Sequence, residues 1–178
     1  MKKILFCVMA LFFTFMLYGQ EQQQVEIKDG TPFSYVYMVF SGSHYQIHQK
    51  IPVFIQEARK QQLQTKVTGD LFGIYFDFRG QVAGVDTVWG LGFKMAKDTT
   101  IQLPLKKAQY NYEKIARMIH VGPYVLVDLA YSVMIPLIEE KGMEVVGPPI
   151  ETWLDDPDQV KPEDCRTEII VPIRQIKK

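Results

Sequence analysis

The sequence has few of the residues on which disulfides, metal sites and cysteine chemistry depend. It contains 2 cysteines and 3 histidines in 178 residues. Cys7 lies in the apolar N-terminal run, so an exported chain that loses this run would keep Cys165 as its one thiol and could form no internal disulfide. His44 and His48 have the i, i+4 spacing of a helical metal pair, but no third ligand is evident near them. We therefore expect no metal and no other cofactor, and the role of Cys165 stays open.

An excess of positive charge is also lacking. The chain has 20 Lys and Arg against 20 Asp and Glu, which gives a formal net charge of +0. A surface that neutralises nucleic acid phosphates needs a basic excess, so we expect no nucleic acid partner. Glycine-rich phosphate loops and the nucleophile elbow of serine hydrolases are missing too. No motif therefore assigns a catalytic residue.

One long apolar run is present, and it lies at the N-terminus. Lys2 and Lys3 precede the apolar residues 4–18, and the small residue Gly19 follows. This order is typical of a secretory signal peptide, and the run is short for a membrane span of about 20 residues. We expect residues 1–20 to be a cleaved signal peptide and the product to be periplasmic or extracellular, with no membrane attachment after cleavage. A retained N-terminal anchor is the alternative.

Two parts of the remaining chain resemble each other. The stretch "GDLFGIYFD" aligns without a gap with "GPPIETWLD", which places Tyr75 on Trp153 at an offset of 78 residues. Upstream, "SGSHY" matches "HVGPY" with one residue inserted, which places Tyr45 on Tyr124. Self-similarity of this kind indicates an internal duplication. The chain therefore contains two copies of one unit.

The duplication predicts the domain organisation and the fold class. Residues 21–32 are polar and predict a flexible lead-in, and residues 33–178 predict a single domain with copies over about 33–94 and 107–173. Each copy has the pattern of strand, helix, strand and strand, and the second helix should end at Gly142. One such unit covers its own sheet poorly. We expect an α+β fold with pseudo-twofold symmetry, in which one antiparallel sheet carries both helices on one side and a concave ligand cup on the other.

A carboxylate stands inside an apolar and aromatic strand of the second copy. In "GPPIETWLDD", breakers bound a short strand in which Glu151 and Trp153 share one face, about 7 Å apart. A carboxylate beside an indole lies either at an exposed edge or at the floor of a pocket. Glu151 is therefore the residue on which a functional prediction depends.

The ordered set of motifs resembles a known family. "HVGPY", an amphipathic helix that ends at Gly142, "GPPIETWLDDP" and "KPEDCRTEIIVPI" follow one another behind a duplicated unit. In this order they are similar to the GyrI-like, AraC effector-binding domain family over residues 33–173. The resemblance implies a small-molecule binding module whose cup, lined with aromatic rings, holds a cationic or aromatic ligand at a central glutamate. Glu151 stands at the position of that glutamate, and Trp153 takes the aromatic position after it.

The candidate ligand-binding residues follow from this resemblance and from the duplication. In the first copy Gly73 replaces the glutamate, so one carboxylate is expected at this place in the cup. A carboxylate beside an indole offers a ligand cation both ionic and cation–π attraction. The candidates are Glu151, Trp153, Tyr75, Trp89, Tyr45 and Tyr124. The aromatic residues among them are also the type that packs in a core.

Other functions stay open. Some relatives are similar to hydrolases of small electrophilic or toxic compounds, and on this reading Glu151 would be a general base. A third reading is an envelope interaction protein whose cup is filled by its own side chains. Because of the histidine pair, a haem-binding, SOUL-like protein is a further alternative. We expect the partner to be a small molecule, and the oligomeric state is not predicted.

Overall fold

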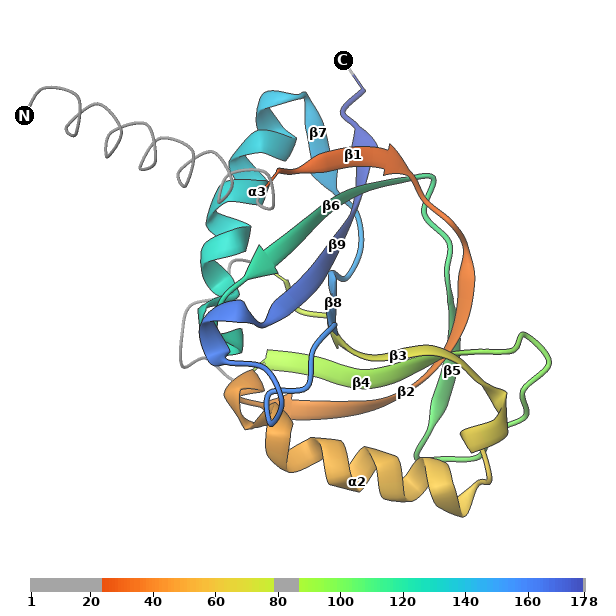
Figure 1. Cartoon of the computed structure of the whole chain (residues 1–178). Helices are drawn as coiled ribbons and strands as arrows, with labels where there is room; N and C mark the ends of the chain where they lie inside the picture. Colours follow the sequence, from red (N-terminus) through yellow and green to blue (C-terminus); the bar gives the residue numbers. More distant parts are fainter. Residues whose placement is uncertain (1–23, 79–86, 178) are drawn as a thin grey trace, which may run out of the picture.

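A computed structural model describes residues 24–78 and 87–177, which form a large antiparallel sheet with two helices (Figure 1). The elements of the first half are β1 (Glu26–Asp29), β2 (Phe33–Gly42), α2 (Ile47–Lys60), β3 (Val67–Tyr75) and β4 (Thr87–Met95). Those of the second half are β5 (Lys106–Tyr110), β6 (Lys114–Val121), α3 (Asp128–Glu140), β7 (Met143–Val145), β8 (Ile150–Trp153) and β9 (Arg166–Gln175). Short 3-10 turns lie at His44–Gln46, Gln64–Lys66, Tyr124–Leu126 and Pro162–Asp164. Within the two described ranges, no helix is long and apolar enough to span a membrane.

The order of the strands is symmetrical about the centre of the sheet. The hydrogen-bonded order is β1-β6-β9-β8-β3-β4-β2-β5, and β7 pairs with β9. The second half thus runs β6-β9-β8 toward the centre and the first half runs β3-β4-β2 away from it. The α+β class with one antiparallel sheet is confirmed, while the superposition of the two copies stays a prediction.

Both helices cover the same face of the sheet. Partners across neighbouring strands point their side chains to one side, and the register joins Ile169 to Glu151, Glu151 to Gly73 and Gly73 to Leu91. Ile169 packs in the cluster under α3 and Leu91 in the cluster under α2. Figure 1 shows α3 beside β6 and β9, and α2 beside β2 and β4. Glu151 therefore faces the helix layer, between the two packed clusters.

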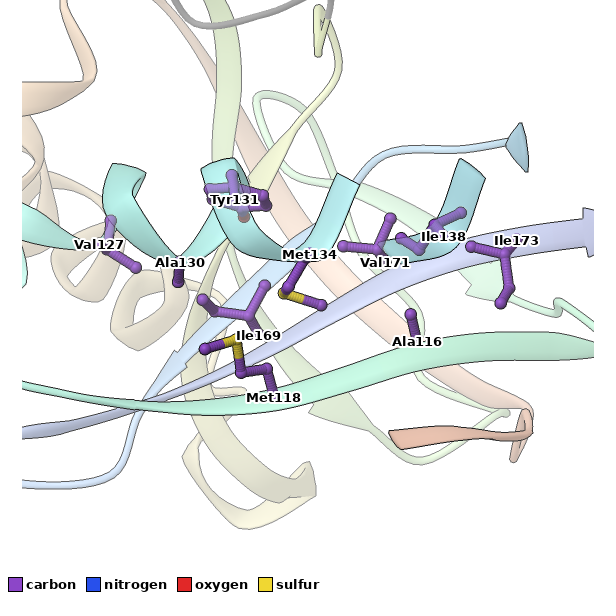
Figure 2. Packing of buried hydrophobic residues seen from close by; sticks show 10 residues of the cluster. All are labelled: Ala116, Met118, Val127, Ala130, Tyr131, Met134, Ile138, Ile169, Val171 and Ile173. Carbon is purple, nitrogen blue, oxygen red and sulfur yellow. The ribbon is translucent and has the colours of Figure 1, made fainter. Parts of the chain in front are cut away.

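Apolar side chains hold each helix on this face. Figure 2 shows the cluster under α3, where Met134 and Ile138 of the helix meet Met118 of β6 and Ile169 of β9. Phe54 anchors α2 in the same way and is 0% exposed, as is Met134. Burial of a side chain of this size contributes about 1.5–3 kcal/mol. The helices are thereby fixed relative to the strands that carry the candidate site.

Glycines with positive φ lie near the points where the helices begin and end. Gly42 at the end of β2 and Gly122 just after β6 have φ of 109° and 143°, conformations that favour glycine. Each is followed by a 3-10 turn that leads into the helix. Gly142 has φ of 68° and lies two residues after Glu140, the last residue of α3, which confirms the predicted stop.

Two predictions about the sheet are wrong in detail. The lead-in predicted as flexible over 21–32 contains β1, whose residues Glu26–Asp29 pair with β6. The polar composition hid this strand, because an edge strand with one solvated face needs few apolar residues. The cup was expected on the face away from the helices, but the register turns Glu151 and Trp153 toward them.

Candidate functional site

The carboxyl group of Glu151 is buried at the centre of the sheet. Glu151 is 2% exposed, and it pairs with Gly73 on the neighbouring strand β3. These two residues are also related by the offset of 78 that joins the two copies, so equivalent positions meet here. A Cβ at position 73 would lie 3.1 Å from the Tyr75 hydroxyl and 3.4 Å from a ring carbon of Trp153. Glycine thus leaves room for both rings around the glutamate.

Two buried phenols donate to this carboxylate. The Tyr75 hydroxyl on β3 donates to Oε2 at 2.7 Å, and the Tyr131 hydroxyl on α3 donates to Oε1 at 2.9 Å. Burial, and after it the charge of Glu151, raises the pKa of both tyrosines well above the usual value, so both remain donors. Burial raises the pKa of Glu151 to about 7, against the lowering effect of the two hydrogen bonds. The carboxyl group is therefore poised to ionise near neutral pH.

Glu151 has no cationic partner in the described part of the chain. The ion pairs of the structure join other residues, and the two hydrogen bonds to its carboxylate come from neutral phenols. Buried charges in proteins are normally paired or bind a metal. Asp128, the other carboxylate that acts on it, raises the pKa of Glu151 further. A negative charge on Glu151, at the centre of the sheet, therefore has no positive partner among the described residues.

A second polar group lies at the start of the two helices. The Tyr45 hydroxyl donates to Oδ2 of Asp128 at 3.0 Å, which links the 3-10 turn before α2 to the first turn of α3. Oδ1 of Asp128 and Nε2 of His44 are buried and have no hydrogen-bond partner among the described residues. The His44 ring stands edge-on to the Tyr75 ring, with centroids 6.0 Å apart, and burial lowers its pKa. At neutral pH His44 is therefore uncharged and does not neutralise either carboxylate.

A cavity opens along α3 next to these residues. Its volume is about 510 Å³, within the usual range for small-molecule sites. Tyr131 lines it and its hydroxyl also donates to Glu151, so this residue connects the cavity to the buried carboxylate. The Phe78 and Tyr131 rings lie 4.9 Å apart. The full lining is Phe78, Asp128, Tyr131, Ser132, Ile135, Pro136 and Val145.

Cavities on the other face of the sheet carry charges that are already paired. One of about 680 Å³ is lined by Arg117 and Arg166 among others, and one of about 350 Å³ shares Arg117. Arg117 binds Glu168 at 2.6 Å and Arg166 binds Asp155 at 2.9 Å. We place the candidate site on the helix face because the unpaired carboxylates lie there, although a larger cavity lies elsewhere.

The model of the GyrI-like small molecule binding domain matches residues 23–174. The chain belongs to this family. No curated protein matches the chain. Among solved structures, the C-terminal domain of EcmrR aligns with a TM-score of 0.73 at 18% identity, over 86% of this chain and 98% of that one. At this identity the likeness shows the fold.

Two further structures of similar fold differ in what their descriptions report. SAV2435 bound to tetraphenylphosphonium has a TM-score of 0.55 at 15% identity, over 85% of this chain and 94% of that one. A hydrolase from Listeria innocua has a TM-score of 0.61 at 16% identity, over 86% and 93%. GyrI-like folds thus occur both in a protein that holds an organic cation and in one described as a hydrolase.

The structure brings some of the predicted residues of this GyrI-like domain together and separates others. Tyr75 contacts Glu151, and Trp153 lies half-buried beside Tyr75. Trp89 is 1% exposed and donates from Nε1 to the Gly42 carbonyl at 3.2 Å, so it is a core residue and not part of an open cup. The β3–β4 register turns it to the same face as Tyr75, where it packs in the cluster under α2.

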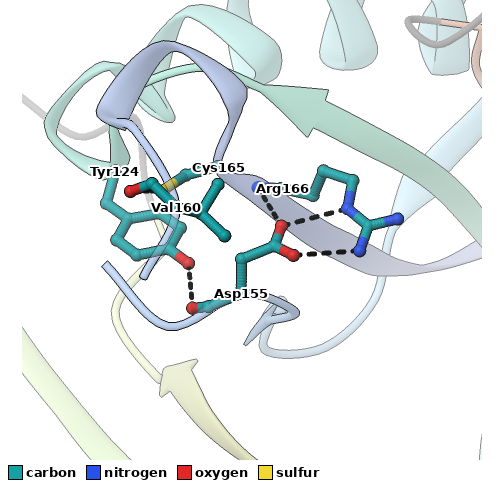
Figure 3. Close-up of polar contacts among 5 residues, drawn as sticks. All are labelled: Tyr124, Asp155, Val160, Cys165 and Arg166. Carbon is teal, nitrogen blue, oxygen red and sulfur yellow. Dashed lines mark hydrogen bonds and ion pairs between the residues drawn. The ribbon is translucent and has the colours of Figure 1, made fainter. Parts of the chain in front are cut away.

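Tyr45 and Tyr124, which the sequence comparison aligns with each other, lie in different surroundings. Tyr45 is 41% exposed and reaches the site through Asp128. Tyr124 donates to the Asp155 carbonyl at 2.6 Å and lies beside Cys165 (Figure 3), whereas the hydrogen bonds to Glu151 come from Tyr75 and Tyr131. Cys165 is buried there, which gives this thiol a packing role. Arg166 completes the cluster through its ion pair with Asp155.

Sequence reasoning missed two residues of the site. Tyr131 and Asp128 lie three apart on α3, on the side that faces the sheet and the cavity. A tyrosine within the buried stripe of Val127, Ala130 and Met134 was the available signal, because a buried phenol normally finds a hydrogen-bond partner. The described residues contain no group of three or more His, Cys, Asp or Glu that could hold a metal.

Proposed function

We propose that this protein binds a small organic cation with aromatic character at the Glu151 centre and the adjoining cavity along α3. The observation that carries the proposal is the carboxylate of Glu151, which is 2% exposed and is bonded only to neutral phenols among the residues described. A ligand cation would supply the opposite charge that the fold does not. The family membership and the cation held by SAV2435 support the same chemistry.

The lining of the cavity suits an aromatic ligand. The Phe78 and Tyr131 rings offer apolar surface and π-faces, and cations gain about 0.5–2 kcal/mol from such faces. Tyr131 lines the cavity and donates to Glu151, so we infer that a cation reaches the carboxylate when this phenol turns aside. Rotation of one side chain would thus couple ligand entry to exposure of the buried charge.

The test compares Glu151→Gln with the unchanged protein. Glutamine keeps the shape and removes the charge, so binding of tetraphenylphosphonium should weaken by about 1–3 kcal/mol, the scale of a charge-assisted contact. The neutral triphenylphosphine oxide should lose much less. Isothermal titration calorimetry measures both. Glu140→Gln, an exposed carboxylate at the end of α3, is the matched control and should change neither affinity.

Equal affinities of the Glu151→Gln variant and the unchanged protein for both compounds would overturn the proposal. A drop in affinity that is the same for the cation and the neutral compound would point to altered shape and would also count against it. Melting temperatures of the three proteins, measured in the same buffers, show whether each variant is folded.

A hydrolase is the second candidate, and one observation favours it. Burial raises the pKa of Glu151 to about 7, which is the range in which a carboxylate serves as a general base. A water molecule activated at this group would attack a small electrophile held in the cavity. In that case Glu151→Gln should abolish turnover of an electrophilic substrate while its binding changes only modestly. Turnover that survives the substitution would exclude Glu151 as the base.

We also propose that the binding module is exported. The support is the order of charge, apolar run and small residue at the N-terminus of the sequence. A module in the periplasm or outside the cell would meet organic cations before they reach the cytoplasm.

A further inference from the structure

We propose that Asp128 is a second anchor of the ligand site, and that the site therefore prefers an aromatic dication over a matched monocation. The inference rests on the proposed function, because it adds a second charge contact to the same cavity. It concerns a residue of α3 and not the glutamate of β8.

Asp128 lines the cavity of about 510 Å³ and has one carboxylate oxygen with no hydrogen-bond partner among the described residues. Its Oδ2 accepts from Tyr45, while its buried Oδ1 has no partner in the part of the chain that the structure describes. A buried acceptor without a partner costs free energy, and a ligand donor would remove that cost.

Asp128 and Glu151 both lie near the Tyr131 side chain. Asp128 precedes Tyr131 by three residues, so the two side chains lie on the same side of α3. The Tyr131 phenol reaches Glu151 at 2.9 Å. The charge of Asp128 acts on Glu151 and on Tyr131 alike, which shows that the three groups are near one another. The site thus offers one carboxylate that lines the cavity and one that is buried, both close to Tyr131.

No cation of the described chain neutralises this pair. Asp128 takes part in none of the ion pairs found, nor does Glu151. Burial lowers the pKa of His44, which disfavours a positive charge on its ring at neutral pH. A ligand with one positive group can neutralise only one of the two carboxylates. A ligand with two basic groups joined by an aromatic spacer can neutralise both.

Two biphenyl amidines test the preference. 4-Phenylbenzamidine carries one amidinium, and biphenyl-4,4′-dicarboxamidine carries two on the same ring system. Calorimetric titration of the full chain at pH 8 should show the diamidine binding about tenfold tighter, as one added charge-assisted contact predicts. Asp128→Asn should remove this difference and leave the monoamidine affinity within about twofold of the original. Glu151→Gln should weaken both compounds.

Control variants separate a ligand contact from a structural role. Tyr45→Phe keeps the carboxylate and removes its donor, so the preference for the diamidine should persist or increase. Glu140→Gln should leave it unchanged. If Asp128→Asn does not fold, loss of the preference in the folded Tyr45→Phe variant would still overturn the inference.

The outcomes distinguish this inference from the function on which it rests. Binding of both amidines with equal affinity to the unchanged protein overturns the second anchor and leaves the first. Equal weakening of both compounds by Asp128→Asn does the same. Failure of the unchanged protein to bind any of these cations overturns both proposals together.

Discussion

At the scale of single residues, the site depends on the environment of one carboxyl group. Glu151 loses hydration by burial and gains two phenol donors, and the burial outweighs the donors because its pKa rises to about 7. A fully paired structural carboxylate would instead have its pKa lowered by its partners, as Arg166 lowers that of Asp155. The contrast identifies Glu151 as a group whose ionised state the fold does not stabilise.

This environment predicts how stability depends on pH. The folded-state pKa of Glu151, about 7, exceeds its ordinary value of 4.5, so the folded protein keeps a proton that the unfolded chain loses between these values. The contribution of this group to stability therefore falls as pH rises from about 4.5 to about 7, by roughly 3 kcal/mol in all. In Glu151→Gln this decline should be absent. Urea unfolding at pH 5 and pH 8 measures the difference.

The groups around the Glu151 carboxyl support the predicted loss of stability as the pH rises. Tyr75, Tyr131, His44 and Asp128 face it from β3, from α3 and from the turn before α2. The phenols stay protonated because their pKa values are raised, and burial lowers the pKa of His44, so neither change supplies a positive charge to compensate the new negative one. Parallel stability curves for the two proteins would contradict the prediction.

At the scale of elements, the β3–β8 pair brings the two halves of the chain together at the site. The offset found in the sequence maps Gly73 onto Glu151, and the register pairs the same two residues. This pairing is what a pseudo-twofold relation between the two halves would predict. A side chain at position 73 would press on the Tyr75 hydroxyl at 3.1 Å and on the Trp153 ring at 3.4 Å, whereas glycine leaves room for both beside Glu151. The asymmetry noted in the sequence thus has a packing reason.

A second element-scale feature is the ion pair that ties the segment after β8 to β9. The carboxylate of Asp155 accepts from the Arg166 backbone nitrogen at 2.8 Å, from Nε at 3.0 Å and from Nη2 at 2.9 Å (Figure 3). Tyr124 adds a bond to the Asp155 carbonyl. These contacts fix the segment without touching the Glu151 centre.

Asp155→Asn should therefore lower stability and leave ligand binding alone. Arg166 holds the pKa of Asp155 below its usual value, so the stabilisation is present at neutral pH and is lost as the pH falls below about 4. Thermal unfolding should show a lower melting temperature for the variant at pH 7 and a smaller difference near pH 3. A changed affinity for tetraphenylphosphonium would show that this segment does reach the site.

Much of the fold could be predicted from the sequence, and the reasons are local. Strand and helix periodicity and the stop at Gly142 depend on near neighbours, and so they predicted β2, α2, β6 and α3. The face on which Glu151 lies depends on strand register, which no local pattern reveals. For the same reason Tyr131 and Asp128 were missed, and Trp89 was placed in a pocket although it packs in the cluster under α2.

At the scale of the whole molecule, the site lies at the seam between two halves. Tyr75 comes from the first half, while Glu151, Tyr131 and Asp128 come from the second. Tyr45 of the first half bonds Asp128 of the second. A ligand held there would contact both halves and strengthen their association. Each half alone would present an incomplete site.

The location of the molecule in the cell is a prediction at the same scale. Lys2 and Lys3, the apolar residues 4–18 and Gly19 have the order of an export signal. Protein purified from the native host should therefore start near Gln20 or Glu21 when its N-terminus is sequenced. Fractionation of the same cells should recover it outside the cytoplasm.

Removal of Lys2 and Lys3 also leaves 18 basic against 20 acidic residues, so the mature protein should migrate as slightly more acidic than the full chain. An intact Met1 on protein from the cytosol would contradict export, whereas an intact Met1 on membrane-bound protein would show that the segment is kept as an anchor.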